Sequence, residues 1–169
     1  MANTHSEARR YFFDFSKLDL ILQKHHTQKS KAELNKEMEV IDKLAWIEIV
    51  GKKVLCARSR GKDIFYIPGG KREHGETDHQ ALVREIEEEL SVHLDDATLN
   101  YVGTFQAQAH GKPVGVEVKM QCYSGAYEGD ILPYSEIEEI AWLNTNDMDI
   151  IAPVDKIIFN WLKEHQQID

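Results

Sequence analysis

Three glutamates in the middle of the chain are spaced to share one face of a helix. At 100° per residue, Glu85, Glu88 and Glu89 fall within about 100° of arc. Like charges at these spacings repel one another by a few tenths of a kcal/mol per pair. Mg²⁺ or Mn²⁺ would remove this repulsion, because both ions prefer carboxylate, carbonyl and water ligands and complete their shells with substrate phosphates. Taken alone, the cluster is equally typical of a solvated acidic helix face.

The loop before this helix has features of a segment that binds phosphate groups. Gly69, Gly70 and Gly75 allow tight backbone turns and the close approach of a ligand. Lys71 adds positive charge beside these glycines. Arg84, just before the acidic stretch, is placed to bridge from the helix to the loop and fix their geometry. The loop and the helix together favour a metal-assisted site over a plain acidic surface.

Loop and helix also match a known motif. The residues read Gly70-x5-Glu76-x7-Arg84-Glu85-Ile86-x-Glu88-Glu89-x-Ser91-Val92. This pattern resembles the Nudix box, Gly-x5-Glu-x7-Arg-Glu-U-x-Glu-Glu-x-Gly-U, in which U is an apolar residue. Every position matches except the last glycine, which is Ser91 here and which would cap the C-terminus of the helix. The replacement affects the predicted end of the helix and not the predicted metal site. Outside this motif, a looser resemblance to the family extends over about residues 42–165.

The resemblance implies a function and a set of metal ligands. Nudix family members hydrolyse a nucleoside diphosphate linked to another moiety, X. By this resemblance the box glutamates, which are Glu85, Glu88 and Glu89, bind Mg²⁺ or Mn²⁺, and the Gly69 carbonyl is a further ligand. Two such ions can bridge phosphate oxygens and lower the pKa of the attacking water.

Other residues of the family pattern imply supporting roles and leave the catalytic base open. Glu76 would join the outer shell or a second metal ion and pair with Arg84, which explains an arginine inside an acidic cluster. The base is either Glu85 or a glutamate from a later loop. The later candidates are Glu136, Glu138 and Glu139.

The residues expected to contact substrate are fewer and less distinctive. Arg58 could reach phosphates or be a solvated strand end, and Lys71 is a similar case. Gly70 would let the substrate approach the backbone. Phe65 could stack on a base, as could Tyr66 and Trp142, but aromatic residues on strands also pack in cores. The polar segment 144–147 could read a base edge or cap a helix.

Length and charge exclude several classes of protein. The 169 residues suffice for one domain of ordinary size, and 29 acidic against 20 basic residues give a net charge of −9. This balance argues against a nucleic-acid coat, but a bound cation can still reverse the sign of a site locally. Two cysteines are too few for a disulfide framework, and no cluster suggests zinc. The polar start and the lack of a long apolar run predict a cytoplasmic protein without a membrane partner.

The pattern along the chain predicts strands around one central helix and a closing helix. Residues 1–40 contain no Gly or Pro, and we expect an N-terminal extension that is helical, with a helix over 30–41, or partly mobile. Such an extension could serve as a dimer arm of a homodimer. The remaining 41–169 form the predicted Nudix domain. Its expected strands are 44–50, 53–58, 64–67, 99–107, 114–127 and 137–143, and its expected helices are 78–92 and 150–165.

Fold class and reaction follow from these elements and from the resemblance. Strands, a helix, more strands and a final helix predict an α+β fold with a mixed β-sheet between helices, the α/β/α sandwich of the Nudix family. The predicted activity is pyrophosphate hydrolysis of a nucleoside triphosphate, canonical or modified, to the monophosphate and pyrophosphate. Nucleotide sugars, ADP-ribose and dinucleoside polyphosphates stay open as substrates. The alternative from another class is a non-catalytic ligand sensor, but such modules often lose box carboxylates and this chain has all four.

Overall fold

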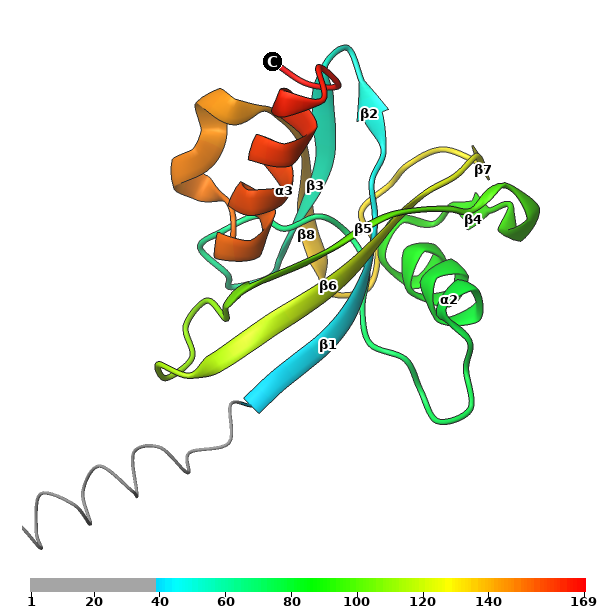
Figure 1. Cartoon of the computed structure of the whole chain (residues 1–169). Coiled ribbons are helices and arrows are strands. Elements are labelled where there is room, and N and C mark those ends of the chain that lie inside the picture. The colour runs from blue at the N-terminus through cyan, green and yellow to red at the C-terminus, as the bar shows by residue number, and fades with distance from the viewer. Residues whose placement is uncertain (1–38) are drawn as a thin grey trace, which may run out of the picture. The chain divides into compact units, whose positions relative to one another are not determined.

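The computed structural model describes residues 39–169, which form a layered α+β structure (Figure 1). The strands are β1 (Glu39–Trp46), β2 (Ile49–Val50), β3 (Lys53–Ser59), β4 (His93–Leu94), β5 (Asn100–Gln108), β6 (Val116–Ser124), β7 (Tyr127–Glu128) and β8 (Ile137–Leu143). The helices are α2 (Asp78–Leu90) and α3 (Pro153–Glu164), with 3₁₀ turns at η1 (Asp96–Thr98) and η2 (Thr145–Ile150).

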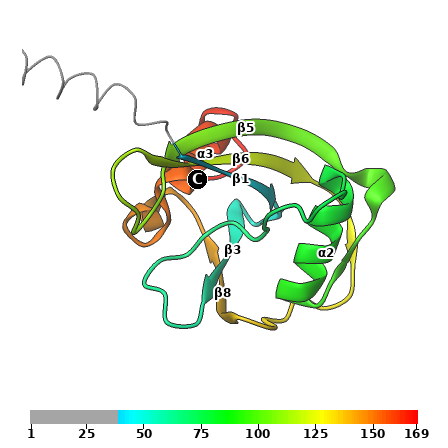
Figure 2. The ribbon, with the colours of Figure 1, turned by 90° about the horizontal axis from the view of Figure 1, so that it is seen from below.

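The strands form a mixed arrangement. One sheet has the order β1-β6-β5, in which β1 pairs in parallel with β6 and β5 pairs antiparallel with it. A second sheet has the antiparallel order β2-β3-β8, and β4 pairs with β7. The helices α2 and α3 lie on opposite sides of these strands (Figures 1 and 2).

Each long central strand contributes to two separate cores. In β1, Leu44 and Trp46 pack in the cluster that includes α2, whereas Ala45 packs in the cluster that includes α3. In β3, Leu55 faces the α2 cluster and Cys56 faces the α3 cluster. Successive side chains of a strand point to opposite faces, so these strands are buried on both sides between two helices. The predicted α+β class with a mixed sheet between helices is confirmed.

The central helix ends where the motif requires it, although the motif's last glycine is missing. Thr77 caps the start of α2, accepting a bond from the Gln80 amide while the Gln80 side chain accepts one from the Thr77 amide. Ser91 adopts a left-handed conformation, with φ 60° and ψ 23°, and its amide donates to the Glu87 carbonyl at 3.1 Å. Serine thus takes the backbone conformation that glycine favours at this position.

The predicted helix over 30–41 is wrong at its C-terminal end. Residues 39–41 are the first residues of β1 and pair with residues 116–118 of β6. The physical reason is that a ladder with a distant strand supplies hydrogen bonds and burial that override a weak local helix preference. The rest of that predicted helix, and the predicted extension before residue 39, lie outside the described residues.

A predicted strand is absent and the predicted closing helix begins later than expected. Residues 64–67 form no strand, but Phe65 and Tyr66 each make a single bridge, to Ile151 and Ala57. The closing helix begins at Pro153 and not at 150, because residues 145–150 form a 3₁₀ turn and proline favours the first helical position.

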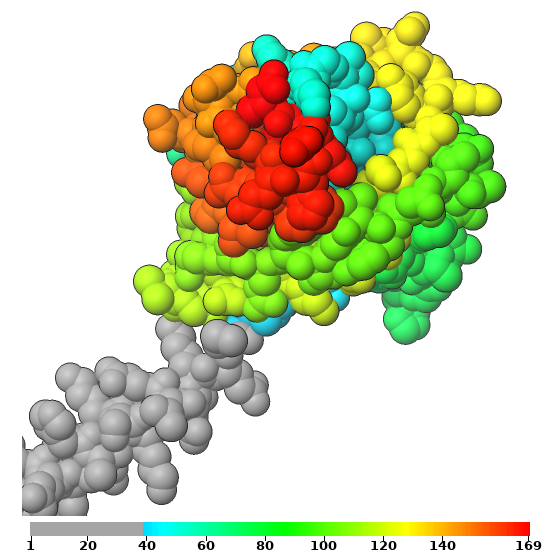
Figure 3. Space-filling model, turned by 45° about the horizontal axis from the view of Figure 1, so that its top comes forward, coloured from blue at the N-terminus to red at the C-terminus, as the bar shows by residue number. Residues whose placement is uncertain are grey.

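The C-terminal residues close the fold against its first hairpin. In the space-filling view, the end of the chain after α3 lies beside the β2–β3 hairpin (Figure 3). The Thr145 amide donates to the Asp169 carbonyl at 3.1 Å, and the Asp169 amide donates to the Lys52 carbonyl at 3.4 Å. These bonds fix the position of α3 relative to β3.

Neither helix in residues 39–169 has the length and apolar content needed to cross a membrane.

Candidate active site

The arginine of the motif ties the loop to the helix. The Arg84 guanidinium donates to both carboxylate oxygens of Glu76, from Nε at 2.7 Å and from Nη2 at 2.8 Å. Nη2 also donates to the Lys71 carbonyl at 3.1 Å. The bond from Arg84, together with a bond from the Glu73 amide, lowers the pKa of Glu76 to about 2, and the same pair raises the pKa of Arg84. This fork is a rigid, charge-assisted contact that fixes the loop over α2.

Two adjacent glycines let the loop backbone reach the helix carboxylates. A Cβ atom on Gly70 would overlap the carboxylate of Glu85, and a Cβ atom on Gly69 would overlap the Leu44 carbonyl. The Gly69 amide donates to Glu89 Oε2 at 2.9 Å. Gly69 also has φ of 139°, which disfavours other residues. Only glycine therefore permits this approach at both positions.

The carbonyl of Gly69 is available to a ligand. The carbonyls on either side of it accept bonds from β1, Pro68 from the Trp46 amide at 2.9 Å and Gly70 from the Leu44 amide at 2.8 Å. Within residues 39–169, the Gly69 carbonyl accepts no hydrogen bond. These bonds to β1 hold the loop in place, and in the described part of the chain they leave the Gly69 carbonyl free to bind a ligand.

The three box glutamates occupy different environments. Arg84 Nη1 donates to Glu85 Oε1 at 3.0 Å and lies 3.5 Å from Glu88 Oε2, which is largely exposed. Glu89 is buried, with 9% of its surface exposed. Burial raises the pKa of Glu89 to about 7, although the Gly69 amide and the charge of Lys43 act in the opposite direction.

These donors fit a hard divalent cation. In the described part of the chain, no three Asp, Glu, His or Cys side chains are gathered closely enough to hold a metal by themselves. The fitting set instead combines the Gly69 carbonyl with the carboxylates of Glu85 and Glu89, which are all oxygen donors. Glu88 can join when its side chain turns away from Arg84. Gly70 lacks the Cβ atom that would fill the space beside Glu85.

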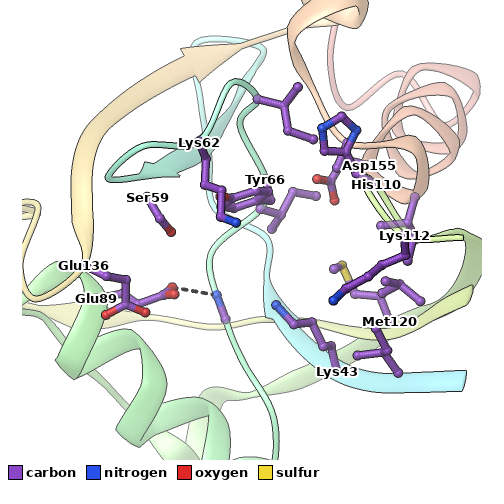
Figure 4. A pocket seen from close by; sticks show the side chains of 18 residues that line it. Lys43, Ser59, Lys62, Tyr66, Glu89, His110, Lys112, Met120, Glu136 and Asp155 are labelled. Carbon is purple, nitrogen blue, oxygen red and sulfur yellow. Dashed lines mark hydrogen bonds between the residues drawn. The ribbon is translucent and has the colours of Figure 1, made fainter. Parts of the chain in front are cut away.

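A cavity of about 330 Å³ begins at the buried glutamate and extends between the sheets (Figure 4). Glu89 and Glu136 line one end of it. Lys43, Lys62 and Lys112 also line the cavity. In a chain with a net charge of −9, these three lysines offset the acidic side chains of the same cavity and give an anionic ligand cationic partners.

Four residues expected to contact substrate lie outside this cavity, namely Arg58, Phe65, Gly70 and Lys71. Arg58 is engaged by Glu138 at 3.0 Å and Glu139 at 2.7 Å, and its guanidinium lies 5.6 Å from the centre of the Phe65 ring. Phe65 is buried in the α3 core, and Lys71 contributes its carbonyl to Arg84. Gly70 makes room for Glu85 and does not line the cavity.

Other predicted residues divide between the cavity and the framework. Of the later-loop glutamates only Glu136 lines the cavity, together with Tyr66. Trp142 packs at the edge of the α2 core. Asn144 accepts a bond from the Asn146 amide and caps η2, so the structure supports the capping interpretation of segment 144–147.

Sequence reasoning missed the lysines of the cavity and a buried acid, Asp155. The lysines come from β1 and two separate loops, so no local spacing links them. Asp155 did carry a signal, because it interrupts the apolar stripe of α3 formed by Val154, Ile158 and Leu162. A carboxylate on such a stripe is either partnered or functional.

Comparison with known proteins places this geometry in a family. The sequence model described as the NUDIX domain matches residues 45–163. The uncharacterized Nudix hydrolase YvcI of Bacillus subtilis (strain 168) is 27% identical over 116 residues, which are 68% of this chain and 73% of that protein.

Solved structures with the same fold are also found. The E. coli ORF135 protein is 25% identical, with a TM-score of 0.59 over 78% of this chain and 96% of that one. The MutT protein from Methanosarcina mazei Go1 is 16% identical, with a TM-score of 0.61 over 77% of this chain and 97% of that one. A bifunctional NMN adenylyltransferase/ADP ribose pyrophosphatase from Francisella tularensis, complexed with AMP and a Mn ion, is 20% identical, with a TM-score of 0.56 over 87% of this chain and 48% of that one.

The three structures share the α+β fold described above, and the NUDIX match includes the whole loop and helix that carry the motif. Because this match covers more than half of the chain, the protein belongs to the Nudix family of pyrophosphohydrolases.

Proposed function

We propose that this chain hydrolyses a nucleoside triphosphate, canonical or modified, to the monophosphate and pyrophosphate with the help of Mg²⁺ or Mn²⁺. The observation that carries the proposal is the contact of the Gly69-Gly70 backbone with Glu85 and Glu89 at the mouth of a lysine-lined cavity. It joins a set of oxygen donors for a hard cation to a cavity suited to an anion.

Each residue of the site has a proposed role. The metal ligands are the Gly69 carbonyl and the box glutamates, and the bound metal supplies charge neutralisation and an activated water. Arg84 and Glu76 position these ligands through their fork. The cavity lysines neutralise substrate phosphates.

The catalytic base is proposed to be Glu136, with Glu85 as the alternative. Glu136 lines the cavity beside Glu89, whereas Glu138 and Glu139 are paired with Arg58. Because those two carboxylates already hold Arg58, we assign Arg58 a positioning role beside the site. Lys71 remains a proposed phosphate contact on the outer side of the loop.

The size of the cavity supports a substrate with one nucleoside. A volume of about 330 Å³ is at the low end of the range for ligand pockets. A second nucleoside or a sugar would then lie outside the cavity. ADP-ribose is the main rival substrate, because one structural neighbour carries an ADP ribose pyrophosphatase. The cytoplasmic location and a homodimer stay predictions.

The test is a substrate panel resolved by chromatography, with Mg²⁺ and Mn²⁺ in turn. The panel contains canonical and oxidised nucleoside triphosphates, nucleotide sugars, ADP-ribose and dinucleoside polyphosphates. We expect a triphosphate to yield its monophosphate and pyrophosphate, and Glu88→Gln to lower turnover by about 10²-fold or more. Glu87→Gln is the matched control, because Glu87 lies on the same helix near His93 and outside the site.

The other outcomes of the panel would change the substrate, the metal site or the class of protein. Cleavage confined to ADP-ribose, a nucleotide sugar or a dinucleotide would keep the reaction and overturn the substrate. Turnover that is equal in Glu88→Gln and Glu87→Gln would overturn the metal site. If no substrate is cleaved while Mg²⁺ still raises the melting temperature of the wild type, the sensor alternative gains support.

A further inference from the structure

Lys43 is a half-buried cation on the inner face of the sheet. In β1 it stands between Ile41 and Ala45, which are the apolar residues two positions away and therefore on the same face of the strand. In the parallel ladder with β6, Lys43 lies opposite Met120, and both residues line the cavity. Moving an ammonium group out of water into such surroundings costs free energy unless an anion pairs with it.

The protein itself supplies no such anion in the part of the chain that the structure describes. None of the ion pairs among residues 39–169 includes Lys43. Its charge does act to lower the pKa values of Glu89 and Asp155, although burial raises both. Figure 4 shows the Lys43 side chain between these two acids at the cavity. The ammonium group of Lys43 is therefore available to an anionic ligand.

Lys43 differs from the other two lysines of the cavity in how it is held. Lys62 and Lys112 are exposed and come from loops, so water can hydrate their ammonium groups. Lys43 lies on a paired strand, and the amide of the next residue, Leu44, donates to the Gly70 carbonyl at 2.8 Å. The backbone thus fixes the position of Lys43 relative to the glycine loop and its oxygen donors.

We propose that Lys43 binds the phosphate group that is attached directly to the nucleoside of the substrate. This inference rests on the proposed function, because it takes the outer phosphates to lie at the metal ligands and the nucleoside to lie in the cavity. The phosphate between these two parts would then enter the cavity at its Glu89 end, beside Lys43. A phosphate oxygen there provides the missing counter-charge and accepts a charge-assisted hydrogen bond from the ammonium group.

The experiment measures binding and needs no turnover. The four ribonucleosides and their 5′-monophosphates are titrated by calorimetry into the full chain in the presence of a chelator. In Lys43→Met we expect the affinity for the tightest monophosphate to fall at least about tenfold, because a hydrogen bond between two charged groups is lost. The affinity for the corresponding nucleoside should be unchanged. Lys43→Arg keeps the charge and should hold the monophosphate within about threefold of wild type.

Two further variants serve as matched controls. Lys62→Met and Lys112→Met each remove the same charge from the same cavity, but from an exposed loop position. Both should keep monophosphate affinity within about threefold of wild type, because exposed charges contribute little. Equal losses in all three Lys→Met variants would show that only the summed charge of the cavity matters, which would overturn the assignment to Lys43.

Other results would also overturn the inference. These are an unchanged monophosphate affinity in folded Lys43→Met, an equal loss for nucleoside and monophosphate, and no binding of any monophosphate by the wild type. If Lys43→Met fails to fold, Lys43→Gln removes the charge with a polar side chain and carries the same expectation. A wild type that binds monophosphates through Lys43 but hydrolyses no triphosphate would refute the proposed function alone.

Discussion

Replacing Gly70 with alanine should disable the metal site while the fold stays intact. The added Cβ atom would meet the Glu85 side-chain carboxylate far inside the 3.4 Å at which ordinary contact begins. The side chain can move aside, and its carboxylate must shift by at least about 1.5 Å to reach a normal carbon–carbon separation. The φ angle of Gly70 lies outside the left-handed region, so alanine fits the backbone there.

This displacement of the Glu85 carboxylate should impair metal binding strongly and change the stability of the fold only slightly. Metal–ligand distances tolerate about 0.2 Å, and a 1 Å misplacement at a catalytic centre costs roughly 10²-fold in rate. The stability change should stay within about 1 kcal/mol, because the alanine methyl restricts the unfolded chain while Glu85 is moved. We therefore expect kcat/KM to fall by about 10²-fold with little change in the melting temperature without metal.

The assay is triphosphate hydrolysis, together with the melting temperature measured against Mg²⁺ concentration. Gly75→Ala is the matched control in the same loop, since Gly75 has φ of 89° and no atom within 4 Å of the added Cβ. That variant should lose about 1–2 kcal/mol of stability through backbone strain and keep its rate per folded molecule. Wild-type kcat/KM and an unchanged Mg²⁺ response in Gly70→Ala would refute the assignment of Glu85 as a metal ligand.

Three further predictions follow from single contacts. Ser91→Gly should raise the free energy of unfolding by about 0.5–1 kcal/mol in denaturant titrations, because serine is held in a left-handed conformation that glycine adopts without strain; a loss of stability would contradict this. Arg84→Lys should lower kcat/KM at least about tenfold while the protein stays folded, because lysine cannot hold both oxygens of Glu76; an unchanged rate would mean that charge alone suffices. The pKa of Asp155 is raised to about 8 from an ordinary 3.8, so the native state keeps a proton that the unfolded chain has released. The free energy of unfolding should therefore fall as pH rises from about 4 to 8, by up to about 4 kcal/mol at pH 7, and this fall should be absent in Asp155→Asn; parallel pH profiles of the two proteins in denaturant would contradict the burial of a protonated acid.

The sequence by itself determined the parts that depend on local spacing. The pattern from Gly70 to Val92 specified a glycine loop, a helix and an acidic face, and α2 spans Asp78–Leu90 in the structure. Period-two and period-3.6 patterns gave the α+β class in the same way. Such features can be predicted from the sequence because neighbouring residues set both the backbone conformation and the faces that side chains occupy.

Tertiary structure alone decided which distant residues meet. The start of β1 at Glu39 depends on a parallel partner in β6, and the pairing of Arg58 with Glu138 and Glu139 depends on the antiparallel register of β3 with β8. The cavity joins Lys43 of β1 to Asp155 of α3, residues that no local pattern connects. Burial is a property of the packed chain, so only the folded structure could reveal that the carboxyl group of Asp155 is fully enclosed.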